Sequence, residues 1–335
     1  MINGASTSRE ASTMSTAAPG LHHDLPFDPT YGHTLDTLLA IGPPPDEPAD
    51  FDDFWAARYR RALAVDVAPE LGPASRVGGH LIQPIHYTST DGVRVGGWLT
   101  TPADDPIVRG AVYLHGYGGR TEPQPDLLPP GTAAIWPCAR GLGTESRLPG
   151  VADNGAGHVL HGIGTAETYI HGGCVADVWC AATALTRVHP AAAQRLAYLG
   201  DSFGGGIGAM AVAFDDRFDA VVLGVPSFGH HPLRLTLPCT GSGDAVRRHH
   251  DQHPEVIEVL RYFDAATAAK RVRHRSHVAA ALFDPHVPPP GQFAVYNALA
   301  GPKTLHVLTA GHFDHPGVVT ERSALDAARK DFLQS

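Results

Sequence analysis

The sequence predicts an α/β fold in which helices cover both faces of a mostly parallel sheet. The chain has 335 residues, 43% of them hydrophobic, which is enough to form the core of one large domain. From residue 110 onward, short and continuously apolar runs alternate with segments that have helical apolar spacing. Continuous apolar strands between helices are typical of a parallel sheet that is buried on both faces.

The first elements precede this alternation. Residues 51–63 have apolar side chains at helical spacing behind an acidic first turn, so we expect an amphipathic helix there. Residues 80–102 contain two β-rich runs joined by Thr90-Asp91-Gly92. Asp-Gly supplies the positive φ of a tight corner, so these runs are expected to form a hairpin.

The alternating part supplies the main sheet. Its expected strands are residues 110–116, 132–140, 195–200, 220–226, 277–284 and 304–311. Its expected helices are residues 172–188, a helix from residue 203, residues 292–299 and a last helix that ends near residue 332. We expect residues 1–20 to be a disordered tail and residues 21–335 to be one domain. Residues 227–261 are rich in His, Pro and Gly and are expected to be an insertion over the carboxyl edge of the sheet.

Charge and composition exclude several classes of protein. The chain carries 25 basic and 34 acidic residues, a net charge of -9, which argues against nucleic acid as a partner. A run of 18 apolar residues, as needed to span a membrane, is missing, and the first 20 residues lack the apolar stretch of a secretory leader. We therefore expect a cytoplasmic protein. The four cysteines contain no C-x-x-C pair and are expected to be buried free thiols.

A nucleophile motif stands at Gly200-Asp201-Ser202-Phe203-Gly204. It matches G-x-S-x-G between an expected strand and an expected helix, which is the context of the nucleophile elbow in α/β-hydrolases. The flanking glycines allow the strand to turn directly into the helix, and the turn exposes the serine hydroxyl. The alternative is a glycine-rich turn in which Ser202 merely caps the helix.

Two residues further along the chain suit the remaining positions of a catalytic triad. Asp284 and His312 each follow the end of an apolar run, and the order Ser, Asp, His is that of α/β-hydrolases. A neutral imidazole takes the serine proton, and a carboxylate orients the imidazole. His286, Asp314 and His315 are the rival candidates nearby.

Backbone N–H groups are expected to bind the oxyanion. One belongs to Phe203, directly after the nucleophile, and the other to Tyr117 in the glycine-rich stretch "HGYGG". The pairs His250/His253 and His274/His277 do not form a known closed metal site. "GDSFGGG" lacks the Lys and Ser/Thr of a phosphate-binding loop. The residues therefore predict neither a metal nor another cofactor, and a small-molecule ester as the binding partner.

Several blocks in order resemble the acetyl xylan esterase and cephalosporin C deacetylase family of carbohydrate esterases. The blocks are "DEPADFDDFW", "GVRVGGWL", "YLHGYGG", "CARGLG", "GDSFGGG", "LFDPHVPPPGQFAVYNAL" and "AGHF". The resemblance implies an α/β-hydrolase fold, removal of acetyl groups from sugars or antibiotics, no cofactor, and a homo-oligomer, often a hexameric ring. It places Ser202, Asp284 and His312 in the triad and Tyr117 and Phe203 at the oxyanion positions.

The sequence departs from this family beside the expected site. Apolar residues replace polar ones in the Arg-Gly-Gln, Gly-x-Ser-Gln-Gly and His-Glu motifs, at Leu142, Phe203 and Phe313. We therefore expect Arg140, Leu142, Phe313 and Pro226 to line a substrate pocket that is repacked as one apolar unit and accepts a less polar ester.

The sequence departs from the family at a fourth position, and two alternative functions fit it as well. Where the family has Tyr-Tyr-Arg-Gly, this chain has His171 in place of the arginine. One alternative function is a carboxylesterase, peptidase or C–C hydrolase on the same scaffold. Another is a non-catalytic binding module that uses residues 227–261 as its contact surface.

Overall fold

The computed structural model describes residues 20–335 of the chain. The tail expected over residues 1–20 lies outside the described residues, apart from Gly20. The α-helices are α1 (Leu35–Leu39), α2 (Phe51–Leu63), α3 (Gly155–His158), α4 (Ile170–Val188), α5 (Phe203–Val212), α6 (His231–Arg234), α7 (Ser242–Gln252), α8 (Val256–Leu260), α9 (Ala265–Ala269), α10 (Pro289–Ala298) and α11 (Val318–Gln334). The strands are β1 (Glu70–Leu71), β2 (Ser75–Val77), β3 (His80–Thr88), β4 (Arg94–Pro102), β5 (Arg109–Leu114), β6 (Thr132–Pro137), β7 (Leu196–Asp201), β8 (Phe218–Gly224), β9 (Arg275–Ala281) and β10 (Lys303–Leu308). Short 3-10 helices are η1 (Thr90–Gly92), η2 (Pro125–Leu127), η3 (Pro190–Gln194) and η4 (Arg261–Phe263).

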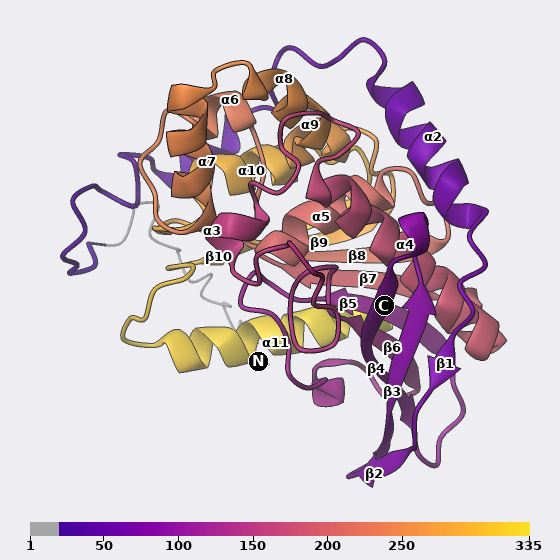
Figure 1. Cartoon of the computed structure of the whole chain (residues 1–335). Coiled ribbons are helices and arrows are strands. Elements are labelled where there is room, and N and C mark those ends of the chain that lie inside the picture. Colours follow the sequence, from indigo (N-terminus) through magenta and orange to yellow (C-terminus); the bar gives the residue numbers. More distant parts are fainter. Residues whose placement is uncertain (1–19) are drawn as a thin grey trace, which may run out of the picture.

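The strands form one sheet in the order β1-β3-β4-β6-β5-β7-β8-β9-β10, with β2 paired to β3 (Figure 1). Strands β6, β5, β7, β8, β9 and β10 run parallel to one another, while β1 to β4 pair antiparallel. The mostly parallel sheet is therefore confirmed. The predicted hairpin is β3 and β4, and φ at its corner is +63° at Asp91 and +70° at Gly92.

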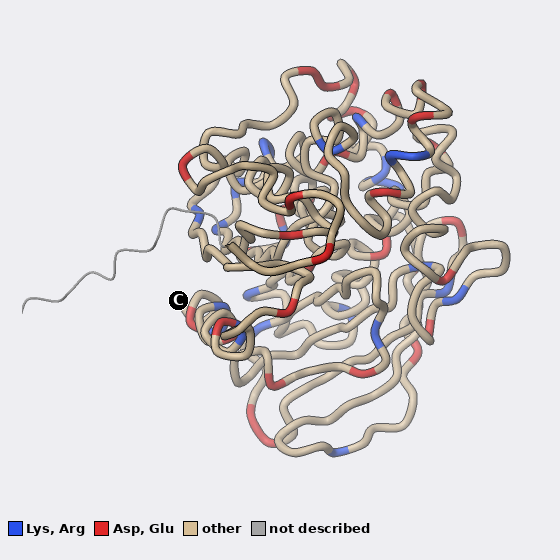
Figure 2. The backbone as a smooth tube through the Cα atoms, turned by 90° about the vertical axis from the view of Figure 1, so that its left-hand side faces the viewer, with Lys and Arg blue, Asp and Glu red and all other residues tan. Residues whose placement is uncertain are grey.

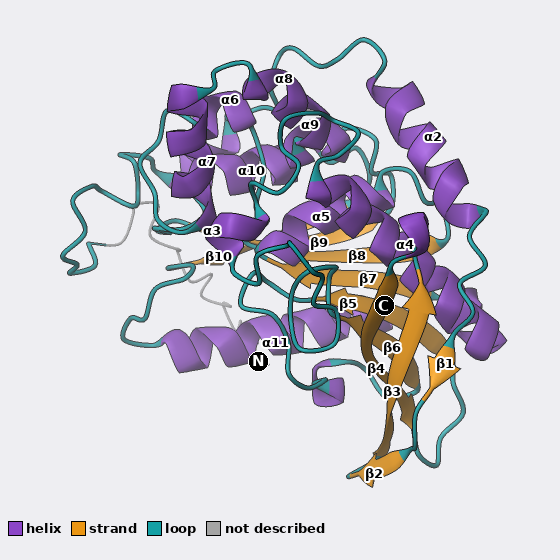
Figure 3. Cartoon of the chain, in the orientation of Figure 1, coloured by secondary structure: helices purple, strands orange, loops and turns teal. Residues whose placement is uncertain are grey.

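Helices lie on both faces of this sheet (Figure 3), as predicted. Along β7, Leu196 and Tyr198 pack into one hydrophobic core, and Ala197 and Leu199 pack into another. The first core includes residues of α4 and α5, and the second includes Leu333 of α11. Because both faces of β7 are covered, the strand is apolar at successive positions rather than at alternate ones. Its carboxyl end, which leads to Ser202, is held in the middle of the sheet.

Residues 227–261, which were expected to be an insertion, are largely helical. They contain α6, α7 and α8, and the turn between α6 and α7 reaches the cavity that opens on Ser202. Helix α6 contacts α10, and α7 contacts α3. The His, Gly and Pro residues that obscure the helical period of this segment lie mainly at the ends of these short helices.

The remaining observations concern thiols, membranes and charge. Cys138, Cys174, Cys180 and Cys239 are free and buried, as the sequence predicted. Within residues 20–335, every helix is too short or too polar to cross a membrane. Figure 2 shows Lys and Arg interspersed with Asp and Glu along the chain rather than gathered in one basic region.

Candidate active site

Ser202 lies at a sharp turn between β7 and α5. Its φ of +55° falls in the left-handed region that residues other than glycine rarely adopt. Its N–H donates to the Gly224 carbonyl at 2.8 Å, which ties the turn to β8. A Cβ at Gly200 would lie 2.4 Å from the Gly204 carbonyl oxygen, and one at Gly204 would lie 2.7 Å from the Leu114 carbonyl oxygen. A side chain at either position would therefore clash with the backbone, so both must be glycine.

The Ser202 hydroxyl forms a hydrogen bond with His312 rather than with the backbone of α5. It makes no capping hydrogen bond to α5, so the interpretation of Ser202 as a plain helix cap is wrong. Its Oγ lies 3.0 Å from His312 Nε2, and His312 Nδ1 lies 2.8 Å from Asp284 Oδ2. The three residues follow the carboxyl ends of β7, β9 and β10, which are parallel strands of the same sheet. The structure thus brings together the three side chains that the sequence singled out.

The Asp284 carboxylate is fully buried and accepts four hydrogen bonds. Oδ1 accepts from the N–H groups of His286 and Val287, both at 2.9 Å. Oδ2 accepts from Gln292 Nε2 at 3.0 Å and from His312 Nδ1. Because a carboxylate can only accept, His312 carries its proton on Nδ1 and presents an unprotonated Nε2 to the serine hydroxyl.

The environment of His312 makes it a stronger base. Burial alone would lower the pKa of the imidazole. The charge and hydrogen bond of Asp284, with a smaller contribution from Asp201, outweigh this effect and raise the pKa of His312 above its usual value of 6.5. The imidazolium that forms when His312 accepts a proton is therefore stabilised.

The rival residues have other partners. His286 borders the cavity, but its Nδ1 lies 2.7 Å from Thr240 Oγ1. His315 Nε2 lies 3.4 Å from a carboxylate oxygen of Glu321, and Asp314 is exposed. Within residues 20–335, no group of three or more His, Cys, Asp or Glu side chains is arranged to hold a metal ion.

A cavity of about 490 Å³ opens on Ser202 and His312, and the loop after β5 forms one of its walls. A Cβ on Gly116 would lie 3.6 Å from Ser202 Cβ, so this loop passes close to the serine. Tyr117 follows in the same wall, and Phe203 is the first residue of α5. Both residues that were expected to bind an oxyanion through their N–H groups therefore border Ser202.

The side chain of Tyr117 anchors this loop to α4. Its ring centroid is 4.4 Å from that of Phe203, and its Oη is 2.9 Å from His171 Nε2. His171 is fully buried, and burial holds its pKa well below the usual value. His171, which stands where the family motif has an arginine, is thus a neutral imidazole that contacts the loop expected to supply an oxyanion N–H group.

The four residues expected to line the substrate pocket lie outside this cavity, so that prediction is wrong. Arg140 is buried in an ion pair with Asp177 at 2.6 Å. Leu142 belongs to the main hydrophobic core. Pro226 is buried beneath the elbow, 2.9 Å from where a Cβ on a glycine of α5 would lie. Phe313 packs against another phenylalanine ring at 4.9 Å.

Small and hydroxyl-bearing residues line much of the cavity instead. They include Gly116, Gly118, Gly155, Ala156, Ser227, Thr240, Gly241 and Ser242. The apolar substitution at Phe203 does not reach this surface, because its ring is fully buried. That ring packs among the rings of Tyr117, His158, His171 and Phe228. Phe203 therefore packs behind the serine, whereas Phe313 packs against Phe283, so the expected repacking as one apolar unit at the pocket is not what the structure shows.

The acetyl xylan esterase (AXE1) family matches residues 31–326. The chain belongs to the acetyl xylan esterase family. Among curated proteins, no match was found.

Solved structures extend this comparison. The acetyl xylan esterase from Paenibacillus sp. R4 has a TM-score of 0.77 and 24% identity, over 89% of this chain and 99% of its own. Acetyl xylan esterase 1 from Thermoanaerobacterium sp. JW/SL YS485 has a TM-score of 0.76 and 21% identity, over 90% and 98% of the two chains. An acylaminoacyl peptidase from Pyrococcus horikoshii has a TM-score of 0.56 and 13% identity, over 81% and 50%. At these identities the structures establish the α/β-hydrolase fold. The family match identifies a carboxylic ester hydrolase of the carbohydrate esterase type.

In this acetyl xylan esterase family member, sequence reasoning missed Gln292. The residue lies on α10 and is fully buried. Its Nε2 donates to Asp284 Oδ2 at 3.0 Å and to the Val287 carbonyl at 2.6 Å, and its Oε1 accepts from the Ala281 N–H at 2.8 Å. A polar residue among the apolar residues of an expected helix was the available signal.

Sequence reasoning also missed the partners of Asp201, the residue before the serine. Tyr113 Oη donates to Asp201 Oδ2 at 2.8 Å, and Arg329 of α11 forms an ion pair with the other oxygen. Burial alone would raise the pKa of Asp201, but Arg329 and Tyr113 lower it below the usual value. Arg329 is four residues from both Leu325 and Leu333, so a charged residue on the apolar stripe of the last helix was the available signal.

Proposed function

We propose that this carboxylic ester hydrolase removes acetyl and other short acyl groups from small sugar esters, with Ser202, His312 and Asp284 as its catalytic triad. The observation that carries the proposal is a chain of two hydrogen bonds, from Ser202 Oγ to His312 Nε2 at 3.0 Å and from His312 Nδ1 to Asp284 Oδ2 at 2.8 Å. Such a relay activates a hydroxyl that is otherwise a weak nucleophile.

Acylation of the enzyme follows from this arrangement. His312 Nε2 takes the proton of the Ser202 hydroxyl while the oxygen forms a bond to the ester carbonyl carbon. The carbonyl oxygen becomes an oxyanion, which the N–H groups of Tyr117 and Phe203 bind, with the positive end of α5 behind them. His312 then gives its proton to the leaving alcohol oxygen as the carbon–oxygen bond of the ester breaks.

Deacylation uses the same groups. A water molecule enters, His312 takes one of its protons, and the resulting hydroxide adds to the acyl carbon. The second tetrahedral intermediate collapses, the bond to Ser202 Oγ breaks, and the serine oxygen recovers the proton from His312. The acid is released and the site is restored. Asp284 keeps the imidazole in one tautomer and stabilises its charged form throughout.

The lining of the cavity supports a small polar substrate. Three residues with hydroxyl groups, Ser227, Thr240 and Ser242, are among those that line a space of about 490 Å³, which is within the usual range for small-molecule sites. Tyr117 and Val287 also line it, but among residues 20–335 no leucine, isoleucine or methionine does, so the apolar substitutions do not make this cavity a wholly apolar pocket.

A panel of substrates tests the proposed preference. Purified protein is assayed with 4-nitrophenyl acetate, 4-nitrophenyl butyrate and glucose pentaacetate. We expect the acetyl ester to exceed the butyryl ester in kcat/KM and acetate to be released from the sugar. Preference for the butyryl ester without release from the sugar would favour a general carboxylesterase instead.

A covalent label tests the proposed nucleophile. A fluorophosphonate probe should modify the chain once, at Ser202, as located by peptide mass spectrometry. A chain that takes up no label in its native state would support the non-catalytic binding module.

We further propose the organisation that the sequence suggested. Residues 21–335 form one cytoplasmic domain that includes residues 227–261, and the chain assembles into a homo-oligomer, a hexamer by family resemblance. Light scattering after gel filtration gives the mass of the assembly, and a monomer at micromolar concentration would contradict the oligomer.

A further inference from the structure

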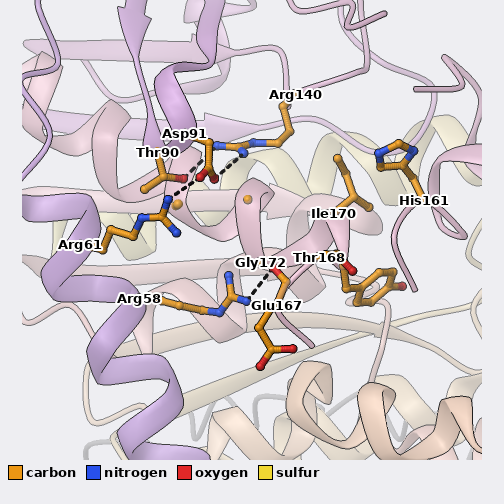
Figure 4. A pocket seen from close by; sticks show the side chains of 13 residues that line it. Arg58, Arg61, Thr90, Asp91, Arg140, His161, Glu167, Thr168, Ile170 and Gly172 are labelled. Atoms are coloured by element: carbon orange, nitrogen blue, oxygen red, sulfur yellow. Dashed lines mark hydrogen bonds and ion pairs between the residues drawn. The ribbon is translucent and has the colours of Figure 1, made fainter. Parts of the chain in front are cut away.

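A second cavity, of about 160 Å³, lies between α2, η1 and the first turn of α4 (Figure 4). It shares no lining residue with the cavity at Ser202. Three arginines line it: Arg58 and Arg61 from α2, and Arg140 from the loop after β6. The close view shows their guanidinium groups with the carboxylate of Asp91 beside Arg61 and Arg140.

Arg140 presents one free edge to this cavity. Its side chain is 6% exposed, and its Nε and Nη2 atoms bind Asp177, with hydroxyl groups of Ser89 and Thr90 also on Nη2. Its Nη1 forms no hydrogen bond within residues 20–335, and the Asp91 carboxylate is 4.0 Å away. The buried guanidinium therefore has unused donors at the cavity.

Arg58 faces the same space without a carboxylate partner. Its guanidinium lies over the ring of Phe54 at 4.5 Å, and its Nη2 donates to the carbonyl oxygens of Ala166 and Glu167. Among the described residues, every carboxylate is more than 4.0 Å from it, since it takes part in none of the ion pairs found. Burial lowers the pKa of Arg58, and the charges of Glu167 and Asp91 do not offset this effect.

Two successive glycines let these arginines reach the start of α4. A Cβ on Gly172 would lie 2.6 Å from Arg58 Nη1, and one on Gly173 would lie 2.4 Å from Arg140 Nη1. Glycine is unfavourable within a helix by about 1 kcal/mol, so both positions give up helix stability for this close approach. Tyr169, which precedes the helix, provides no side-chain cap, and the N–H groups of Ile170 and Gly172 donate to the carbonyl oxygens of His161 and Tyr169.

The positive charge that gathers here is only partly balanced. Asp177 pairs with Arg140, and Asp91 pairs with Arg61. Glu167 also lines the cavity, and its charge acts on Arg58. It forms no ion pair with Arg58 within residues 20–335, so Arg58, beside the positive end of the 19-residue helix α4, has no carboxylate bound to it. Guanidinium groups and helix N-termini both bind phosphate-type oxyanions.

We propose that this cavity is a binding site for a phosphate-type oxyanion, held by the guanidinium groups of Arg58 and Arg140 beside the positive end of α4. Its volume of about 160 Å³ is large enough for one phosphate group. The oxyanion can be inorganic phosphate or the phosphoryl group of a small molecule whose remainder extends into solvent.

Calorimetric titration of the full chain with sodium phosphate tests the site, with sodium chloride holding the ionic strength constant. We expect one saturable site per chain. Arg58→Gln should weaken binding by about tenfold or more, because a charged hydrogen bond is lost, and Arg58→Lys should weaken it less. Arg187→Gln is the matched control, since Arg187 is an exposed arginine paired with Asp66, and it should leave binding unchanged.

Folding of each variant is checked by thermal unfolding, which also gives a second readout. Phosphate should raise the Tm of the unmodified chain and of Ser202→Ala, but not that of Arg58→Gln. Tighter binding of glucose 6-phosphate than of inorganic phosphate would assign the site to a phosphorylated small molecule, and the reverse would assign it to the free ion. Non-saturable heats, equal binding by Arg58→Gln, or tighter binding of acetate than of phosphate would overturn the proposal.

Discussion

Replacement of Gln292 by methionine separates a residue that positions the triad from one that only supports the fold. Methionine keeps the length and roughly the volume of the side chain but removes three hydrogen bonds, at 2.6, 2.8 and 3.0 Å. The Ala281 N–H and the Val287 carbonyl would remain buried without a partner, at about 1–3 kcal/mol each. We therefore expect the free energy of unfolding to fall by roughly 2–6 kcal/mol.

The same substitution should lower kcat and raise the pKa of His312. Without the amide donor, Asp284 holds the imidazole with one contact fewer, and kcat should fall by about tenfold to a hundredfold with little change in KM. The Asp284 charge is also less neutralised, so the pKa of His312 should rise further and the acid limb of the kcat/KM profile should move to higher pH.

Steady-state assays with 4-nitrophenyl acetate from pH 5 to pH 9, together with urea unfolding, provide both measurements. Gln83→Met is the matched control, because the Gln83 amide donates a single 3.3 Å hydrogen bond to the Gly72 carbonyl near the surface. It should change neither kcat nor the pH profile. A Gln292→Met protein with reduced stability but with the kcat and acid limb of the unmodified chain would refute the positioning role.

Three further predictions follow from the same geometry. Asp284→Asn should lower kcat by about 10⁴-fold and change KM by no more than a few-fold, since the wrong imidazole tautomer then faces the serine. Steady-state kinetics at pH 8 measure this, and a fall in kcat of less than tenfold would contradict it. Gly204→Ala should lower the free energy of unfolding by about 1–3 kcal/mol, because its Cβ would lie 2.7 Å and 2.8 Å from two carbonyl oxygens. Gly164→Ala is the control, since no atom lies within 4 Å of a Cβ there. Urea unfolding measures both variants, and equal stability of the two would contradict the prediction. Burial lowers the pKa of His158 to about 4 and that of His231 to about 3, so between about pH 6.5 and pH 4 the unfolded chain binds protons that the folded chain does not. Stability from these groups is therefore complete above about pH 6.5 and falls on acidification by up to about 1.4 kcal/mol per pH unit for each histidine; urea unfolding at pH 7.5 and pH 5 measures it, and equal stability at both would contradict the argument.

The sheet and the placement of its loops could be predicted from local sequence. Buried parallel strands such as β7 are continuously apolar, and the glycines around Ser202 report the close approach of backbone that the turn requires. His312 could be selected from 21 histidines because it follows the end of β10 and because parallel strands bring their carboxyl ends to one edge.

The lining of the pocket could not be predicted in the same way. Arg140 and Leu142 lie within a family motif in the sequence, yet Leu142 packs in the hydrophobic core and Arg140 pairs with Asp177 beside the second cavity. The direction of a side chain in a loop depends on long-range packing. Gln292 and Asp284 are only eight residues apart, but their contact depends on how α10 folds back over β9. Periodicity carries no information on such contacts.

The rate of ester hydrolysis by Ser202→Ala, measured under single-turnover and steady-state conditions with 4-nitrophenyl acetate, tests the central claim most directly. The proposed relay predicts loss of the rapid first release of nitrophenolate and a fall in kcat of about 10⁴–10⁶-fold, in a protein whose unfolding temperature is not lowered. A folded Ser202→Ala protein that keeps the first release and a kcat close to that of the unmodified chain would contradict it.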